Sequence, residues 1–458
     1  MVIKGHGGRS FSRRKMLQLG GALALTALSS PWLTACGHEA GRQEISPTAS
    51  NAATPHTPRS SSNQLATTVR QGLKRHLVMW TYFSEVQLFA RQFEQAHPGV
   101  RVDVKVFPGS DYETKMRLAL QTGQNAPDIF DLERGYIGKY LDAPFVEDLT
   151  PMGAEELVRG YVPYAAALGR DQQGRVKAVT DNASPGGFWY RRDLAKEYLG
   201  TEDPQQVSEM VNDWQKIIAL GKKVVAQSRG KVHLLASYAD VIMVHQYWLQ
   251  PWVSGNALRV DPGWTRVMDI ARDIRLSGVD AKLDAFSPAW GAAWNNGSVI
   301  MFAWPSWAEF LIDKEKTSGK WGIAKAPKGY YAGGTYRAIY TGSHNKDLAF
   351  ELIKFIAQPA WQTYNLQQTH NMPALQKVYE RLADSYHPRL FAGQPVLKTY
   401  YPIAMEIPAR SPDKYSEAIQ SLFNTTVSDM IRKGQSNEEA MAAFKQQVRN
   451  AFPELQVD

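Results

Sequence analysis

Strand and helix signals alternate at short intervals in the first part of the globular body. An apolar run over Leu77 to Phe83 suits a buried strand, and Ser84 is placed to cap a following helix. Apolar and polar residues alternate over Val100 to Phe107, as in a half-buried strand. A second helix, predicted over Tyr112 to Gly123, precedes a third strand at Asp128 to Asp131. Because parallel strands need long connections, this order predicts an α/β fold with helices flanking a mostly parallel sheet.

The length of the chain predicts more than one globular unit. Its 458 residues exceed what a single hydrophobic core usually supports, so we expect two lobes. With 44% hydrophobic and 21% charged residues, the composition is that of a soluble globular protein. The lone cysteine, Cys36, leaves no internal disulfide, no redox pair and no cysteine-rich zinc site.

The formal net charge of +8 is concentrated before the globular body. Ten of the 52 basic and two of the 44 acidic side chains precede His76, which leaves 42 of each sign in residues 76–458. A body without net charge lacks the basic surface that phosphate backbones require. We therefore expect no nucleic-acid partner.

Residues 1–35 have the pattern of an export signal. A basic segment precedes an apolar run, Leu17 to Leu33, which glycine, serine and proline residues interrupt, so a signal peptide is favoured over a membrane span. The segment from Ser12 to Leu17 resembles a twin-arginine motif. Leu33-Thr34-Ala35-Cys36 resembles a bacterial lipobox, which implies that Cys36 receives a lipid.

Residues 36–75 are rich in serine, threonine, alanine, asparagine and proline and show no hydrophobic period. This composition is typical of a flexible tether. A lipid on Cys36 and such a tether predict an extracytoplasmic protein that is anchored to the cell membrane.

Several segments in order resemble the extracellular solute-binding proteins of ABC importers, family 1, of the carbohydrate and maltose-binding type in its lipoprotein form. The resemblance extends from Leu77 to about Phe452. The segments that carry it are Leu77-Val78-Met79-Trp80, Phe93 to Val100, Ala126-Pro127-Asp128-Ile129, Gly187 to Leu194, Ala303-Trp304-Pro305-Ser306-Trp307-Ala308 and Ser343 to Glu351.

This resemblance implies a two-lobed fold of the type II periplasmic-binding-protein kind, in which each lobe is a mostly parallel sheet flanked by helices. Strands that act as hinges join the lobes, so each lobe is discontinuous in sequence. We expect residues 76–183 and 339–386 to form the first lobe, and 184–338 and 387–458 the second. Gly186-Gly187 and Gly333-Gly334 suit hinges, because glycine tolerates changes of backbone conformation.

The resemblance also implies that the protein captures a carbohydrate, an oligosaccharide, in a cleft between the lobes. The liganded, closed form would then deliver it to a membrane permease with a separate ATPase. The chain itself has no G-x-x-x-x-G-K-[ST] phosphate loop, which fits this division of labour. We expect a monomer with no cofactor, no metal and no catalytic residue.

A sugar site needs flat aromatic rings for the C–H faces of the ligand and polar side chains for its hydroxyls. Both aromatic and polar side chains occur at strand ends, on the first crossing strand and at positions that match the family's cleft. Leu132 and Gly135 stand where the maltose-binding pattern has tryptophan and aspartate, which puts maltose itself in doubt. Trp290 and Trp294, four residues apart, are expected in the core instead. The predicted ligand-binding residues are Trp80, Tyr82, Asp131, Glu133, Asp181 with its neighbour Asn182, Tyr247, Trp248, Trp304, Trp307 and Tyr415.

Other functions are compatible with parts of this pattern. A tethered glycosidase or polysaccharide lyase would also be rich in aromatic residues. Such an enzyme needs two carboxylates on either side of the sugar bond that it cleaves. Asp131 and Glu133 share a strand face and are the one pair that this geometry permits, with no second partner. The same fold could bind peptides or polyamines. The sequence does not separate delivery to an importer from presentation to a membrane sensor kinase.

Overall fold

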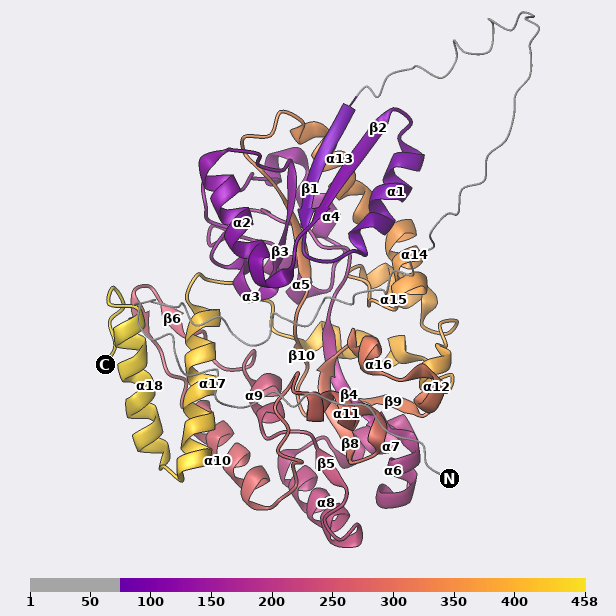
Figure 1. The fold of residues 1–458 in the computed structure, drawn as a ribbon, viewed down its shortest axis with the longest axis vertical. Helices are drawn as coiled ribbons and strands as arrows, with labels where there is room; N and C mark the ends of the chain where they lie inside the picture. The colour runs from indigo at the N-terminus through magenta and orange to yellow at the C-terminus, as the bar shows by residue number, and fades with distance from the viewer. Residues whose placement is uncertain (1–74) are drawn as a thin grey trace, which may run out of the picture.

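The structure, a computed structural model, describes residues 75–458, which form two α/β lobes arranged along the long axis of the molecule (Figure 1). No helix within these residues is long and apolar enough to cross a membrane. The predicted signal peptide, the lipidated Cys36 and all but the last residue of the predicted tether lie outside the described residues.

The first lobe is built on a four-stranded sheet with the order β11-β3-β1-β2. Strand β1 pairs in parallel with β2 and β3, while β11 runs antiparallel to β3. The three strands predicted from the sequence are therefore confirmed, and the sheet is mostly parallel as expected. The four strands are β1 (Arg75–Thr81), β2 (Val100–Val106), β3 (Ile129–Glu133) and β11 (Thr335–Ile339).

The two predicted helices of this lobe are also confirmed, as α1 (Val86–Ala96) and α2 (Gly109–Thr122). The predicted capping role of Ser84 is wrong. Helix α1 begins after Glu85, which already has helical backbone angles, and no side chain caps it. The remaining elements of the lobe are α3 (Arg134–Ile137), η2 (Thr150–Met152), α4 (Ala154–Val158), α5 (Pro163–Leu168), α13 (Lys346–Ile356), α14 (Pro359–Thr369) and α15 (Gln376–Leu382).

The second lobe contains a five-stranded sheet in which β4 is central. Strand β4 runs antiparallel to β8, β9 and β10, and only β5 and β8 are parallel. The expectation of a mostly parallel sheet is therefore wrong for this lobe, because β4 carries the chain away from the first lobe and its neighbours carry it back. The strands are β4 (Pro185–Arg191), β5 (His233–Leu235), β8 (Val299–Pro305), β9 (Trp321–Ala324) and β10 (Tyr330–Tyr331).

Helices cover this second sheet, and the C-terminal pair α17 and α18 packs against α10 (Figure 1). Trp290 and Trp294 are buried neighbours on α11, with ring centroids 5.6 Å apart, so their predicted core position is confirmed. The other elements are α6 (Arg192–Leu199), α7 (Pro204–Met210), α8 (Trp214–Gln227), α9 (Ala239–His245), β6 (Val253–Ser254), β7 (Ala257–Leu258), α10 (Gly263–Leu276), α11 (Pro288–Asn296), η3 (Ala308–Leu311), α12 (Lys314–Thr317), η4 (Arg389–Phe391), α16 (Val396–Glu406), α17 (Ser416–Lys433) and α18 (Asn437–Ala451).

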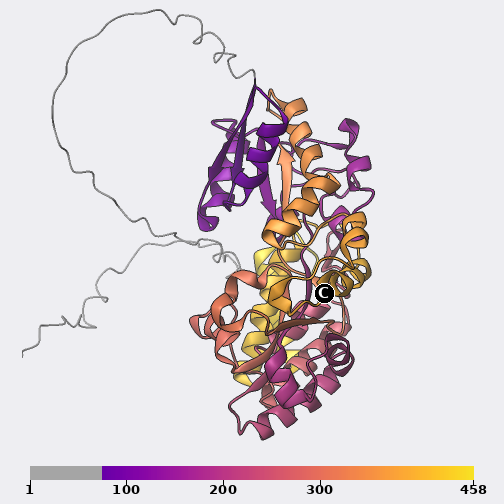
Figure 2. The same ribbon diagram turned by 90° about the vertical axis from the view of Figure 1, so that its right-hand side faces the viewer.

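The chain enters the second lobe along β4, returns to the first lobe along β11, and leaves it again after α15 (Figure 1 and Figure 2). The predicted boundary between residues 338 and 339 falls inside β11, which belongs to the first sheet from Thr335 onward. Gly333 and Gly334, just before β11, have φ angles of +69° and +120°, which favour glycine. Gly186 instead lies inside β4, where a Cβ atom would meet the Tyr330 ring at 2.1 Å.

Candidate functional site

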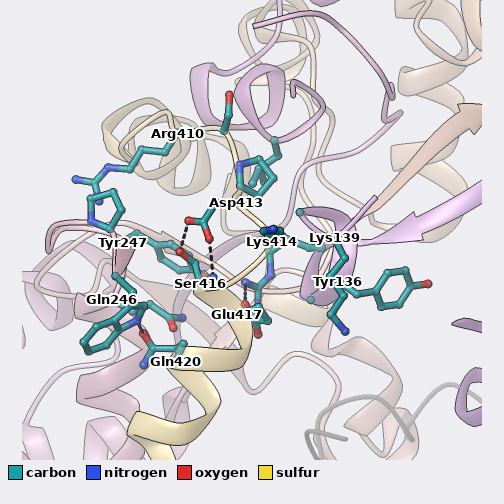
Figure 3. A pocket seen from close by; sticks show the side chains of 18 of the residues that line it. Tyr136, Lys139, Gln246, Tyr247, Arg410, Asp413, Lys414, Ser416, Glu417 and Gln420 are labelled. Atoms are coloured by element: carbon teal, nitrogen blue, oxygen red, sulfur yellow. Dashed lines mark hydrogen bonds and ion pairs between the residues drawn. The ribbon is translucent and has the colours of Figure 1, made fainter. Parts of the chain in front are cut away.

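An open pocket lies between the two lobes, and the space of about 880 Å³ that it encloses includes open solvent (Figure 3). Helix α3 of the first lobe forms one wall, and the segment 408–420, which includes the start of α17, forms the facing wall. The polar and aromatic side chains that line it are Arg134, Tyr136, Lys139, Gln246, Tyr247, Gln250, Trp252, Tyr331, Arg410, Ser411, Asp413, Lys414, Ser416, Glu417 and Gln420.

The two lobes touch directly at this pocket. Arg134 of α3 donates to both carboxylate oxygens of Glu417 on α17, at 2.6 and 3.4 Å. Gln172 of the first lobe donates to the Pro412 carbonyl oxygen at 2.9 Å. Gly138 packs so tightly against Asp413 that a Cβ atom there would lie 2.2 Å from the Asp413 carbonyl oxygen. Contacts from α3, Gly138 and Gln172 to the 411–417 segment therefore join the two lobes at the pocket.

Three tyrosine rings form a continuous stack beside the pocket. Tyr331 on β10 stacks on Tyr164 of the first lobe, at 4.8 Å between ring centroids, and on Tyr247 of the second lobe, at 4.0 Å. The Arg134 guanidinium lies over the Tyr331 ring at 5.7 Å. Burial raises the pKa of Tyr331 to about 12, so its hydroxyl is neutral at physiological pH. The stack gives the pocket an aromatic wall that both lobes share.

The start of α17 is fixed by Asp413, whose carboxylate accepts hydrogen bonds from the backbone N–H groups of Tyr415 and Ser416, both at 2.8 Å, and from the Ser416 hydroxyl. This arrangement satisfies donors that a helix N-terminus leaves free. One turn further along, Gln420 accepts a hydrogen bond from the Trp252 indole at 2.9 Å (Figure 3). The wall formed by α17 is therefore held in place by its own contacts, before any ligand binds.

Glu133 ends β3 and caps α3, where its carboxylate accepts a hydrogen bond from the Gly135 N–H. Burial raises its pKa to about 7, although Arg134 and the Gly135 N–H act in the opposite direction. Glu133 thus positions the helix that carries Arg134, at the edge of the pocket.

This raised pKa predicts a specific pH dependence of stability. Between about pH 4.5 and pH 7 the folded protein binds a proton on Glu133 that the unfolded chain releases, so this group's contribution to stability falls as pH rises. Glu133→Gln keeps the acceptor for Gly135 and stays neutral. We expect the variant to match the wild type at about pH 5 and to be more stable by about 1–3 kcal/mol at about pH 8 in urea unfolding. Glu209→Gln, an exposed control, should show no such pH-dependent difference; the same difference in both variants would contradict the assignment.

Asp131 and Asp181, predicted to contact ligand, instead lie on either side of the buried Arg337 of β11. Arg337 is 2.5 Å from Asp181 and 3.3 Å from Asp131. The Thr81 hydroxyl donates to Asp131 at 2.6 Å, and the Trp361 indole donates to Asp181 at 2.9 Å.

Both carboxyl groups are buried, with residue exposures of 0% for Asp131 and 3% for Asp181. Burial raises the pKa of Asp131 to about 6 against the opposing effects of Arg337 and Thr81. The half-buried Asn182 donates to Asp181 at 3.1 Å. These carboxyl groups therefore join β3, β11 and the first crossing inside the first lobe, which argues against the predicted sugar contacts.

Two of the predicted tryptophans are core residues. Trp80, 7% exposed, packs on Phe107 with ring centroids 4.6 Å apart, and Trp304, 3% exposed, packs on Trp290 at 4.8 Å. Their rings fill the interiors of the two lobes, which argues against ligand contact.

The other predicted aromatic residues are half-buried and stay candidates. Trp307 follows β8 and donates to the Ala332 carbonyl oxygen at 2.9 Å, next to Gly333 at the second crossing. Trp248 donates to Gly329 at 2.6 Å, and Tyr82 shares a hydrogen bond with Thr335. Tyr415 contacts Phe452 edge to face at 5.5 Å. Among these half-buried aromatic residues, Tyr247 lines the pocket between the lobes.

Sequence reasoning missed three residues that form the centre of the site: Arg134, Tyr331 and Glu417. Arg134 directly follows the predicted Glu133 at the end of β3, where ligands of α/β proteins commonly bind. Glu417 lies in the first turn of the helix that Tyr415 precedes, and Tyr331 lies two residues before Gly333. Each of the three residues lies close in sequence to a predicted position. The sequence therefore indicated the right segments, but not these particular residues.

Within residues 75–458, no group of three or more histidine, cysteine, aspartate or glutamate side chains could hold a metal ion.

Two α/β lobes joined by crossing strands around a polar and aromatic pocket define a two-lobed ligand-binding protein. Residues 81–363, more than half of the chain, match the family described as bacterial extracellular solute-binding protein. The chain belongs to this family.

Individual relatives are distant in sequence. The arabinooligosaccharide-binding protein of Halalkalibacterium halodurans is 21% identical over 399 residues, which cover 80% of this chain and 87% of that protein. A crystal structure of an extracellular solute-binding protein of family 1 superposes with a TM-score of 0.74 and 23% identity, covering 82% of this chain and 99% of the other. The sugar-binding protein MalE of Xanthomonas citri superposes with a TM-score of 0.70 and 17% identity, covering 83% and 98%. These structural likenesses establish the two-lobed fold.

Proposed function

We propose that the protein captures an oligosaccharide in the pocket between its lobes and delivers it to the permease of an ABC importer. The observation that carries this proposal is the composition of the pocket: an aromatic stack through Tyr331 and Tyr247 lies beside hydrogen-bonding side chains from both lobes. Relatives whose names specify arabinooligosaccharide and sugar binding support the same ligand class. Contacts with both lobes exist together only in the closed form, so a ligand favours closure.

The proposal includes the location of the protein. The family is extracellular, and the lipobox-like segment ending at Cys36 supports an anchor in the cell membrane. In this reading residues 1–35 direct export, and residues 36–75 tether a monomeric body.

The pocket favours binding over sugar cleavage. Its two lining carboxylates, Asp413 and Glu417, already accept hydrogen bonds from the start of α17 and from Arg134. A glycosidase needs one carboxyl group to donate a proton and another to act as nucleophile or base. Both groups instead hold the helix start and the lobe contact, which argues against that chemistry.

A ligand screen tests the proposed function. We expect one class of oligosaccharide to raise the unfolding free energy by about 4 kcal/mol at a thousandfold excess over Kd, visible as a rise in Tm. Thin-layer chromatography should recover the sugar intact. Tyr247→Ala should weaken binding about threefold to tenfold, because a stacked ring is lost, whereas Tyr198→Ala on α6, outside the pocket, should not. A cleaved sugar, or binding only of peptides or polyamines, would overturn the proposal.

A further inference from the structure

Positive charge outnumbers negative charge in the lining of the inter-lobe pocket. Four basic side chains line it, Arg134, Lys139, Arg410 and Lys414, against two acidic ones, Asp413 and Glu417. The globular body as a whole is electrically balanced. The excess is therefore a local property of the pocket, and local potentials of this kind select the charge of a ligand.

Both acidic side chains of the lining are already committed. Asp413 accepts hydrogen bonds from the backbone at the start of α17, and Glu417 pairs with Arg134 across the lobes. Glu133, which directly precedes α3, accepts from the Gly135 N–H and has a pKa raised to about 7 by burial, so it is partly uncharged at neutral pH. Both lining carboxylates therefore already serve contacts that hold the pocket walls in place.

Within residues 75–458, two of the basic side chains, Arg410 and Lys414, form no ion pair with a carboxylate within 4 Å, although Glu454 and Asp142 act on Lys414 at longer range. Lys139 pairs with Glu113 at 3.2 Å, outside the lining. Arg410 donates through one nitrogen to the Leu249 carbonyl oxygen, which leaves the rest of its guanidinium without a carboxylate. Lys414 lies over the Tyr415 ring at 4.7 Å. Arg410 and Lys414 both lie on the segment 408–420, which forms the second-lobe wall of the pocket (Figure 3).

We propose that the oligosaccharide captured here is acidic, and that Arg410 and Lys414 bind the carboxylate of a uronic acid residue. A guanidinium presents planar, paired N–H donors that match a carboxylate, and a nearby ammonium adds a point charge. Arg410 is half-buried and Lys414 is exposed at the pocket wall, so a carboxylate bound between them would gain an ion pair that a neutral ligand cannot form. The inference rests on the proposed function and specifies its substrate class.

The test compares matched ligands on the full-length mature protein. Oligomers of galacturonate, glucuronate and mannuronate are each titrated beside the same oligomer with its carboxyl groups reduced to alcohols. We expect the acidic form of one series to bind at least about tenfold more tightly at low salt. This preference should shrink as sodium chloride is added, because salt screens partly exposed charges.

Charge-removing variants assign the effect to residues. Arg410→Gln and Lys414→Gln should each weaken binding of the acidic ligand about tenfold and change binding of its reduced form less than about twofold. Lys216→Gln on α8, outside the pocket, removes the same charge and should change neither. Unchanged Tm values of the free variants would show that they remain folded.

The outcomes separate this inference from the proposed function. Reduced oligomers that bind as tightly as the acidic ones, or variants that weaken both forms equally, would overturn the acidic ligand but leave sugar capture standing. A sulfated oligomer of equal length that binds more tightly would overturn the carboxylate assignment. If no oligomer in either series binds but another, neutral oligosaccharide does, the acidic ligand is overturned while the proposed function stands.

Discussion

Replacing Arg337 by methionine should lower the unfolding free energy by about 3–5 kcal/mol. The side chain is fully buried and stands between the carboxylates of Asp131 and Asp181, at 3.3 and 2.5 Å. Methionine fills most of the same volume but leaves two carboxyl groups without a cation in the interior of the first lobe. Urea unfolding at neutral pH measures the loss, and Arg266→Met, an exposed control on α10, should change stability by less than about 0.5 kcal/mol.

A second variant distinguishes the loss of charge pairing from poor packing. Adding Asp131→Asn and Asp181→Asn to Arg337→Met removes the unpaired charges and should restore part of the lost stability, because the three residues form one network. Lower pH should have a similar partial effect on Arg337→Met by protonating the carboxyl groups. A loss below about 1 kcal/mol for Arg337→Met would contradict a structural role of the cluster and reopen Asp131 as a ligand contact.

This cluster also shows why the sequence could predict the first sheet but not the role of Asp131. The strands up to Glu133 follow from local hydrophobic patterns, which need only neighbouring residues. The partner of Asp131 lies on β11, about two hundred residues later, and its approach depends on the antiparallel pairing of β11 with β3. From the sequence alone, a carboxylate at a strand end is therefore predicted to contact a ligand, because the cation that pairs with it lies far away in the sequence.

The second lobe and the pocket were difficult to predict for the same reason. The direction of β8, β9 and β10 relative to β4 is fixed by long connections, and no local pattern encodes it. Trp80 and Trp304 have the residue type that a sugar site needs, yet neighbouring rings enclose both. Arg134 and Glu417 form the inter-lobe contact, although each alone resembles a surface charge. Local sequence patterns therefore predict many of the strands and helices. The site depends on contacts between residues that are far apart in the sequence.

The close contact between Gly138 and Asp413 offers a direct way to open the lobes. Gly138 follows α3 as its C-cap, with backbone angles of −58° and −24°, which alanine adopts without strain. An alanine Cβ would nevertheless lie 2.2 Å from the Asp413 carbonyl oxygen of the other lobe. Because the two residues belong to different lobes, rotation about the crossing strands relieves the clash without unfolding either lobe. Gly138→Ala should therefore destabilise the closed form by about 1–3 kcal/mol while changing the unfolding free energy much less.

This shift should appear both with and without ligand. Small-angle scattering should give a larger radius of gyration for Gly138→Ala than for the wild type, and the apparent affinity for the oligosaccharide should fall about fivefold to a hundredfold, because binding must first restore closure. Gly291→Ala on α11, where a Cβ atom meets nothing within 4 Å, makes the same chemical change and should alter neither quantity. If the radius and the affinity of Gly138→Ala both equal those of the wild type, the 411–413 segment yields locally, and contact between α3 and this segment does not control closure.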